Sequence, residues 1–403
     1  MEKKDKNLNV PNLRFPEFSG EWEKGTLQSV ATLSKGTGIS KDQLSEDGQP
    51  CILYGELYTK YKSEIIDVII SKTDIDSQKL VRSQTNDVII PCSGESAVDI
   101  ATARCVKQSD VLLGGDLNII RLKGEHDGSF FAYQLNGKRK YDIAKVAQGV
   151  SVVHLYGEHL KGVKVDYPSA AEQKKISSLL ALIDQRIETQ KKIIEKYESL
   201  IRGIVETHYS QCECIKQVRI SELGEPFTTM NMSKEDLSEE GNECILYGEL
   251  FTTYGCVIKE VKSRTHISCE KASVSHNNDL LFPASTTVDA LSLIAPSAIC
   301  KSGVILGGDL FGIHINENFN NEYLSYLINC IYRKILARYA QGSTIIHLHY
   351  SDIKNVTIEV PSLSKQNYLA DLIRHIESKI KYEKDMLSKL SIQKAYILSN
   401  LFI

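Results

Sequence analysis

Two long stretches of the chain carry apolar residues at steps that alternate between four and three. The first runs from residue 176 to 204 and the second from 369 to 397, and each has a polar residue, Gln190 or Glu383, at its fifth position. This spacing is typical of a coiled-coil seam. Helices that only cover their own domain are the alternative, but such helices seldom keep this spacing over eight steps. We therefore expect two helices that pair with each other, with Gln190 facing Glu383 whether the pairing is parallel or antiparallel.

The seam positions in the two stretches correspond one to one. The first helix contributes Ile176, Leu180, Ile183, Ile187, Gln190, Ile194, Tyr197, Ile201 and Ile204. The second contributes Leu369, Ile373, Ile376, Ile380, Glu383, Leu387, Leu390 and Ile397, and Lys394 stands at the position that matches Ile201.

Shorter apolar runs lie before each long helix. CILYGELY, DVIIPC and VLLGGDLNII are rich in Ile, Val and Leu and are bounded by Gly, Asn and Asp, which is typical of strands. One further helix is expected over residues 130–147, and its counterpart over 322–340. Each half of the chain thus predicts a mixed unit of strands and helices that a long helix closes.

The two halves are copies of each other. Residues 40–61 and 233–254 are identical at 15 of 22 positions, at an offset of 193, where chance would give roughly one or two matches. The offset persists in VLLGGDLNIIRL against VILGGDLFGIHI, and in the segments that begin AKVAQG and ARYAQG. A repeat this long indicates two homologous domains rather than a solenoid.

Composition and charge limit the class of protein. The chain has 403 residues, 42% apolar and 25% charged, with a net charge of -3, as expected for a globular protein of two or three domains. A protein that grips duplex DNA alone usually carries a basic excess, so any basic surface here is local, or a partner supplies the rest. We expect no membrane span and no signal peptide. The ten cysteines, including the close pair Cys212 and Cys214, are expected to be free thiols in a reducing cytoplasm.

Motifs that would indicate catalysis are missing from the sequence. It has no Gly-rich phosphate loop, no Asn-Pro-Pro or Asp-Pro-Pro with a following aromatic, no Gly-x-Ser-x-Gly and no His-Glu-x-x-His. His154 and His347, which recur in AQG…HL, are either bases or turn-forming residues, and the second role is favoured. The GGDL segments at Gly114 and Gly307 are either anion loops or tight turns that need positive φ, and again the second is favoured. We therefore expect no catalytic, cofactor-binding or metal-binding residue.

The order of these motifs, doubled, resembles the specificity subunits of type I restriction-modification systems. The resemblance rests on VPNLRFPEFSGEWE near the start, P-x-x-x-E-Q-x-x-I at residues 168–176 with LLALIDQRIE after it, ILYGELYTKY and AQGSTIIHL. It implies an α+β fold of two homologous target-recognition domains of mixed α/β structure, separated by two long helices that pair as an antiparallel coiled coil. The expected divisions are a leader at 1–23, a first recognition domain at 24–168, a central conserved helix at 169–210, a second recognition domain at 211–361 and a distal helix at 362–403.

The resemblance also implies partners and a division of labour. The chain would recognise double-stranded DNA in the cytoplasm, each domain reading half of a bipartite asymmetric site, while the helices set the spacer. Two modification (methyltransferase) subunits would bring S-adenosylmethionine, and restriction (translocase/nuclease) subunits would bring ATP and Mg. The alternatives are a diverged stand-alone DNA methyltransferase or nuclease, and a coiled-coil scaffold that binds only proteins.

The second copy departs from the family pattern at several positions. Ser364 and Lys365 replace Ala171 and Glu172, and Glu377 replaces Asp184. Together with Lys394, these changes put in doubt whether both ends of the helix pair hold a methyltransferase subunit equally well.

Base-reading residues are expected where the copies differ, because two heads cannot read different half-sites with identical side chains. The shared Tyr-Gly-Glu-Leu segments at Tyr54 and Tyr247 are then scaffold or contact phosphates. Carboxylates can accept from cytosine and Arg can donate to guanine. The candidates are Ser93, Glu95, Ser96 and Arg104 in the first copy and Ser285, Thr286, Thr287 and Asp289 in the second, with Lys35, Thr37, Lys60 and Thr253 as weaker candidates for phosphate contact.

Overall fold

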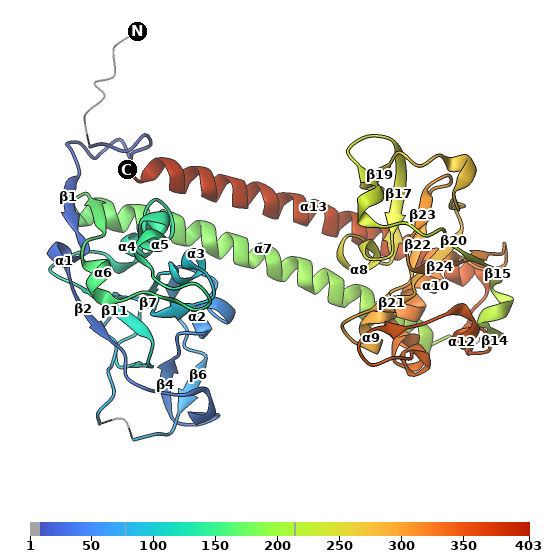
Figure 1. Ribbon diagram of the computed structural model, residues 1–403, viewed down its shortest axis with the longest axis horizontal. Helices are drawn as coiled ribbons and strands as arrows, with labels where there is room; N and C mark the ends of the chain where they lie inside the picture. Colours follow the sequence, from blue (N-terminus) through green and yellow to red (C-terminus); the bar gives the residue numbers. More distant parts are fainter. Residues whose placement is uncertain (1–8, 77, 213–214) are drawn as a thin grey trace, which may run out of the picture. The chain divides into compact units, whose positions relative to one another are not determined.

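The computed structural model describes residues 9–76, 78–212 and 215–403, and its chain divides into two compact units (Figure 1). Unit 1 comprises Met1–Lys192 and Asp385–Ile403, and unit 2 comprises Ile193–Lys384. Each unit therefore contains one copy of the repeat and a part of each long helix.

Each unit is built around a five-stranded sheet, and the two sheets have the same strand order. The order is β2-β11-β7-β9-β5 in unit 1 and β15-β24-β20-β22-β18 in unit 2. The strands of unit 1 are β2 (Ala31–Lys35), β5 (Ile65–Ile66), β7 (Asp87–Pro91), β9 (Arg104–Val106) and β11 (Leu117–Leu122). Those of unit 2 are β15 (Gly224–Thr228), β18 (Val257–Ile258), β20 (Asp279–Pro283), β22 (Ser297–Ile299) and β24 (Leu310–Ile315).

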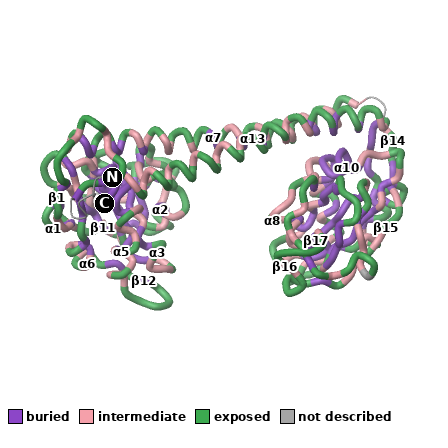
Figure 2. Tube along the Cα trace, turned by 90° about the horizontal axis from the view of Figure 1, so that it is seen from above, coloured by how far each residue is buried: buried purple, intermediate pink, exposed green. Residues whose placement is uncertain are grey.

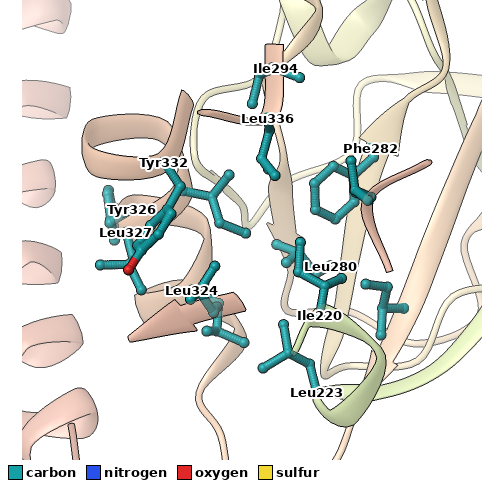
Figure 3. Close-up of a cluster of buried hydrophobic side chains, with 14 of the residues drawn as sticks. Ile220, Leu223, Leu280, Phe282, Ile294, Leu324, Tyr326, Leu327, Tyr332 and Leu336 are labelled. Carbon is teal, nitrogen blue, oxygen red and sulfur yellow. The ribbon is translucent and has the colours of Figure 1, made fainter. Parts of the chain in front are cut away.

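The central strands are largely apolar because both faces of each sheet are covered. Successive side chains of a strand point to opposite faces. Val88 and Ile90 of β7 accordingly belong to one core cluster and Ile89 to another. In unit 2, Leu280 and Phe282 of β20 pack in the cluster drawn in Figure 3, and Leu281 packs on the opposite side. Figure 2 shows that the buried positions are concentrated inside each unit.

Smaller sheets and short helices complete the units, again in matching pairs. Unit 1 adds β1 (Glu23–Thr26) with β13 (Lys164–Tyr167), β8 (Ser93–Gly94) with β12 (Val153–His154), and β10 (Leu112–Leu113), β4 (Gln49–Ile52), β6 (Ser71–Thr73) and β3 (Leu44–Ser45). Unit 2 adds β14 (Lys216–Arg219) with β26 (Thr357–Val360), β21 (Ser285–Thr286) with β25 (Ile346–His347), and β23 (Ile305–Gly307), β17 (Asn242–Leu246), β19 (Ser263–Thr265) and β16 (Leu237–Ser238). The short helices are α1 (Leu27–Val30), α2 (Glu56–Thr59), α3 (Ala97–Ile100), α6 (Gly157–Lys161), α8 (Glu249–Thr252), α9 (Ala290–Leu293) and α12 (Tyr350–Ile353).

The expectation of a single helix over residues 130–147 is wrong, because the structure has two helices there. α4 (Gly128–Asn136) ends at Gly137, and α5 (Lys140–Val146) begins three residues later. Glycine costs about 1 kcal/mol in a helix interior, so it is a common place for a helix to end. The counterpart in unit 2 has no glycine there, and it continues from α10 (Asn321–Leu327) through a π-helical segment (Ile328–Tyr332) into α11 (Arg333–Leu336).

The two long helices are present as expected from the apolar pattern. They are α7 (Ala170–Ser210) and α13 (Leu363–Leu401). Every seam position in both helices is buried or half-buried. In unit 1 the start of α7, at Ile176 and Leu180, shares a core cluster with Leu401 at the end of α13. In unit 2 the end of α7 packs with the start of α13, at Val205 and Leu369.

Within each unit, therefore, the start of one long helix lies beside the end of the other, so the helices run antiparallel there. This confirms the α+β class with two homologous units and antiparallel long helices. The opposition of Gln190 and Glu383 stays a prediction, since these residues belong to different units.

Lys394 occupies its seam position as part of a charged cluster in unit 1. Its Nζ lies 2.9 Å from Glu64 Oε2 and 2.6 Å from Asp184 Oδ1. The hydroxyl of Tyr133 donates to the other Asp184 oxygen at 2.7 Å. A lysine is tolerated in the seam because two carboxylates compensate its charge.

Two further features of the described residues bear on the sequence analysis. No helix among them is long and apolar enough to cross a membrane. Cys212 is a free thiol, as are the other described cysteines, whereas Cys214 lies outside the described residues, as does the part of the expected leader at 1–8.

Candidate nucleic-acid interface

The segment that differs most between the copies meets the AQG segment in each unit. In unit 1, β8 pairs antiparallel with β12, with His154 opposite Ser93. In unit 2, β21 pairs antiparallel with β25, with His347 opposite Ser285. Two segments far apart in sequence thus form one two-stranded ribbon in each unit.

The Tyr-Gly-Glu-Leu segment lies next to this ribbon. Tyr58, which directly follows the segment in unit 1, donates from its hydroxyl to the carbonyl of Ser93 at 3.0 Å. Burial, reinforced by Asp99, raises the pKa of Tyr58, so the hydroxyl keeps its proton for this bond. In unit 2, residues of the Tyr-Gly-Glu-Leu segment and of the ribbon with its loop line one cavity of about 720 Å³. They include Tyr247, Thr287, Ile345 and His347.

The glutamates of the shared segment act in the scaffold. Glu56 is buried and accepts from the backbone N–H of Leu53 at 2.9 Å. Glu249 does the same for Leu246 at 2.8 Å and also accepts from the Ser263 hydroxyl at 2.7 Å. The tyrosines that precede them, Tyr54 and Tyr247, remain exposed and could contact a ligand.

The base-reading candidates of unit 1 lie in different environments. Glu95 is exposed beside the ribbon. Ser93 is buried and donates to Asp116 at 3.0 Å. The Ser96 hydroxyl is the N-cap of α3 and accepts from the Asp99 N–H at 3.1 Å. Of these three side chains, Glu95 is the one whose position leaves it accessible to a base.

Arg104 differs most from what a base-reading residue needs. It is 9% exposed, and its guanidinium donates to the carbonyls of Tyr61 at 3.1 Å and Ala103 at 3.0 Å. Burial lowers the pKa of Arg104, against the effect of Glu64 and Asp184. The expectation that Arg104 is free to donate to guanine is therefore corrected: it lies in strand β9 inside the unit and its donors bind backbone.

In unit 2 the candidates follow the same division. Thr287 is exposed and Thr286 is half-buried, whereas Ser285 is buried. Asp289 is the N-cap of α9 and accepts from the Ser292 N–H at 2.7 Å, which lowers the pKa of its carboxyl. Asp289 occupies the place of Ser96, so a structural role explains both residues.

The four candidates for phosphate contact are dispersed. Lys35 is exposed, and its Nζ lies 5.4 Å from the centre of the Tyr156 ring. Thr37 accepts from the Val81 N–H at 2.9 Å, and Thr253 is half-buried beside α8. Lys60 pairs with Glu56 at 2.7 Å and donates to the Ser71 hydroxyl at 2.6 Å. Lys35 has the best position for a phosphate, since Lys161 and His159 line the same small cavity.

Backbone hydrogen bonds and φ angles show how the shared turns are built. Gln148 and His154 exchange two backbone hydrogen bonds, of 2.9 and 2.6 Å, and so close the AQG loop, as Gln341 and His347 do in unit 2. The GGDL turns do require positive φ, but at different residues: Asp116 (φ 57°) in unit 1 and Gly308 (φ 81°) in unit 2.

The tips of the two AQG loops are exposed positions that are not among the candidates for DNA contact predicted from the sequence. Val150 is 96% exposed and Val152 is 53% exposed, and Ile345 in the matching loop is 50% exposed. The tips read Val-Ser-Val at 150–152 and Ser-Thr-Ile at 343–345, so they differ between the copies. That difference inside an otherwise shared motif was the available signal.

The leader lies against the ends of both long helices in unit 1. Arg14 donates to both carboxylate oxygens of Glu172, at 2.8 and 2.7 Å, and the backbone N–H of Leu13 donates to Asn400 at 2.9 Å. In the second copy Lys365 stands at the position of Glu172 and donates to Cys212 Sγ at 3.8 Å.

Residues 19–199 and 213–391 each match the family model described as type I restriction modification DNA specificity domain. The chain belongs to this family. Among curated relatives, the type I restriction enzyme MjaVIII specificity subunit of Methanocaldococcus jannaschii is 22% identical over 415 residues, covering 97% of this chain and 93% of the relative.

Solved structures of low sequence identity share the fold. The type I restriction-modification S subunit from M. genitalium has a TM-score of 0.63 at 17% identity, covering 98% of this chain and 99% of that chain. A chain from a study of complex assembly and conformational transition of the type I R-M system has a TM-score of 0.55 at 12% identity, covering 94% of this chain and 97% of that chain.

Proposed function

We propose that this chain is the DNA-recognition subunit of a type I restriction-modification complex, and that it carries out no catalysis itself. Each unit reads one half of a bipartite asymmetric site. The observation that carries the proposal is the ribbon beside the Tyr-Gly-Glu-Leu segment: its scaffold is the same in both units, whereas its exposed side chains differ.

The exposed residues at this place have the chemistry that base reading needs. Glu95 can accept from cytosine N4, and Thr287 can bond to several bases. The apolar tips at Val150 and Ile345 can contact the thymine methyl group. They are exposed, so a groove of the duplex can reach them.

The long helices are proposed to set the spacer and to hold the methyltransferase subunits. Helix α7 contains 41 residues, which corresponds to about 60 Å at ~1.5 Å per residue. It is the segment of chain that joins the two copies, so its length limits how far apart the half-sites lie. Two modification subunits with S-adenosylmethionine, and restriction subunits with ATP and Mg, complete the proposed cytoplasmic complex.

The test is methylome sequencing of cells that express this chain with its partner subunits. Two fixed half-sites with a constant spacer are expected. Replacing residues 62–110 together with 150–152 by those of a related subunit should change the first half-site and leave the second unchanged. An unchanged first half-site would contradict the assignment of the reading surface.

A second measurement distinguishes DNA recognition from a scaffold that binds only proteins. In a gel-shift experiment with the methyltransferase subunit, the complex should shift duplex DNA that contains the methylated site. If the methyltransferase subunit binds this chain but the complex retains no DNA, the scaffold is the correct function.

A further inference from the structure

A buried carboxylate and two imidazoles converge at one edge of the five-stranded sheet of unit 2. Asp279, at the start of β20, is fully buried. His314, opposite it on β24, places its Nδ1 2.6 Å from Asp279 Oδ1. His276, in the loop before β20, places its Nδ1 3.1 Å from that of His314. The three ligand atoms all lie within 4.8 Å of one another.

The first copy shows what this position requires. Asp87 is the equivalent buried carboxylate, and Arg121 donates to both of its oxygens, at 2.9 and 2.7 Å. Arg121 also donates to the carbonyl of Arg82 at 3.1 Å, so it ties β11 to the loop before β7. A buried carboxylate needs a cation or several donors, and in unit 1 a permanently charged arginine meets that need.

One backbone contact of this loop is the same in both units. The backbone N–H of Gln84 donates to Asp87 Oδ2 at 2.7 Å, and that of His276 donates to Asp279 Oδ2 at 2.7 Å. The side chains at two positions of this site differ: Gln84 and Arg121 in unit 1 correspond to His276 and His314 in unit 2. Unit 2 thus has two imidazoles, which are common metal ligands, where unit 1 has an amide and a guanidinium.

Hydrogen bonds alone serve the two imidazoles poorly. The Nδ1 of His314 faces Asp279 Oδ1 at 2.6 Å and the Nδ1 of His276 at 3.1 Å, and it carries at most one hydrogen to share between them. A metal ion accepts a lone pair from all three atoms at once.

We propose that His276, Asp279 and His314 bind a divalent first-row transition metal, with zinc as the ion that best suits two imidazoles and one carboxylate. Zinc binds nitrogen at about 2.0–2.1 Å and oxygen at about 2.0–2.2 Å, so tetrahedral ligand atoms lie about 3.3 Å apart. The 3.1 Å between the two Nδ1 atoms is close to that distance, and the 2.6 Å between His314 and Asp279 must widen by less than 1 Å.

The surroundings suit a structural site. Phe227 stacks on the His314 ring at 4.2 Å between centroids and holds its orientation. Glu225 lies opposite His314 on β15, in register, and so on the same face of the sheet. Water or Glu225 would supply the fourth ligand. The ion would tie β24 to the loop before β20, as Arg121 ties β11 to its loop in unit 1.

The test uses the full chain and zinc in competition with a chromophoric chelator. The wild type should bind one zinc ion that His276→Gln loses, with at least about a 100-fold drop in affinity, since even outer-shell changes cost 10–100-fold. His276→Gln introduces the residue that unit 1 has at this place. Substitution His375→Asn, at an exposed histidine of α13, is the matched control and should leave the affinity unchanged.

A second variant separates metal binding from folding. His314→Arg restores the arginine–carboxylate pair of unit 1, so it should fold and lose both the zinc and the sensitivity of Tm to EDTA. Cobalt substitution should give a visible ligand-field spectrum without thiolate charge transfer, which excludes the cysteines. The proposal is overturned if the wild type and His276→Gln bind zinc equally, or if the cobalt spectrum shows thiolate ligation.

Discussion

Replacing Lys394 by Met should destabilise unit 1 through an uncompensated pair of carboxylates. Lys394 is 18% exposed, and its partners Glu64 and Asp184 are each 13% exposed. Glu64 lies in the recognition domain and Asp184 on α7, so this one ammonium group joins α13 to two other parts of the unit. Methionine keeps the length and the apolar character of the side-chain stem but leaves both carboxylates without their cation.

The expected cost follows from how buried these groups are. Removing one partner of a buried ion pair costs about 3–5 kcal/mol, because the remaining charge stays in a poor solvent. Partial exposure places Lys394→Met near the lower end, about 3 kcal/mol. With an m-value of about 2 kcal/mol/M in urea, the unfolding midpoint of the unit should fall by about 1.5 M.

The assay is urea unfolding combined with hydrogen exchange, which assigns the loss to a unit. Peptides around residues 176–184 and 390–401 should lose protection, while those of the unit 2 sheet keep theirs. Adding Glu64→Gln and Asp184→Asn to Lys394→Met should restore most of the lost stability, because the buried charges disappear together.

The matched control is Lys384→Met. It breaks the pair with Glu198 at 3.0 Å, whose side chains are 56% and 51% exposed, and an exposed pair is worth at most about 1 kcal/mol. The reasoning is refuted if Lys394→Met is as stable as Lys384→Met, or if the triple variant is no more stable than the single one.

Three further predictions concern pH, the leader and the spacer. Burial alone would lower the pKa of Lys394, but Glu64 and Asp184 raise it overall. The stability that the charged Lys394 side chain adds is therefore complete below the unfolded pKa of about 10.4 and is lost as pH rises through the folded pKa. The stability difference between wild type and Lys394→Met should shrink in urea melts above about pH 10.4, and a constant difference would contradict this. Substitution Arg14→Ala should cost about 3–5 kcal/mol in urea melts, because Glu172 stays buried without its bidentate partner; Lys175→Ala, which breaks the exposed pair with Glu17, should cost less than about 1 kcal/mol. Inserting four helix-forming residues between Gln190 and Lys191 lengthens α7 by about 6 Å with a net turn of roughly 40°. Methylome sequencing should then show the same half-sites with a spacer about two base pairs longer, and methylation only at the original spacing would show that the helix does not set it.

The long helices and the duplication could be predicted because they follow from local spacing and from comparison of the chain with itself. The proline and the glutamine at the start of each long helix illustrate this. Gln173 and Gln366 are both buried, and each donates to a proline carbonyl at 2.8 Å and accepts from the N–H of Asp127 or Asn320. The same residue recurs because the same helix start is built twice.

Residues that could read bases are hard to predict from the sequence because several of the same side-chain types also serve in folding. Ser96 and Asp289 are small acceptors in a diverged segment, which suits base reading and helix capping equally. Arg104 has the chemistry of a guanine donor, but its strand lies inside the unit, and strand burial depends on tertiary packing. The break at Gly137 and the π-helical continuation at Ile328 likewise depend on what the helix packs against.

The two copies show how a duplicated fold can diverge at buried charges. In unit 1 the cation that meets the helix carboxylate comes from α13, as Lys394 beside Asp184. In unit 2 the carboxylate is on α13, as Glu377, and the cation comes from the recognition domain, as Lys259 at 3.0 Å, while Ile201 takes the seam position.

Each arrangement balances its own charges, but a mixture of the two does not. Moving Lys394 alone into the Ile201 position would put a lysine beside Lys259, and it would find no counterpart of Glu64. Moving the whole set together would keep the charges paired. In these two units the buried charges therefore differ as sets. Under the proposed function, exposed ribbon residues that change one at a time would let the two units acquire separate DNA targets while their scaffolds stay alike.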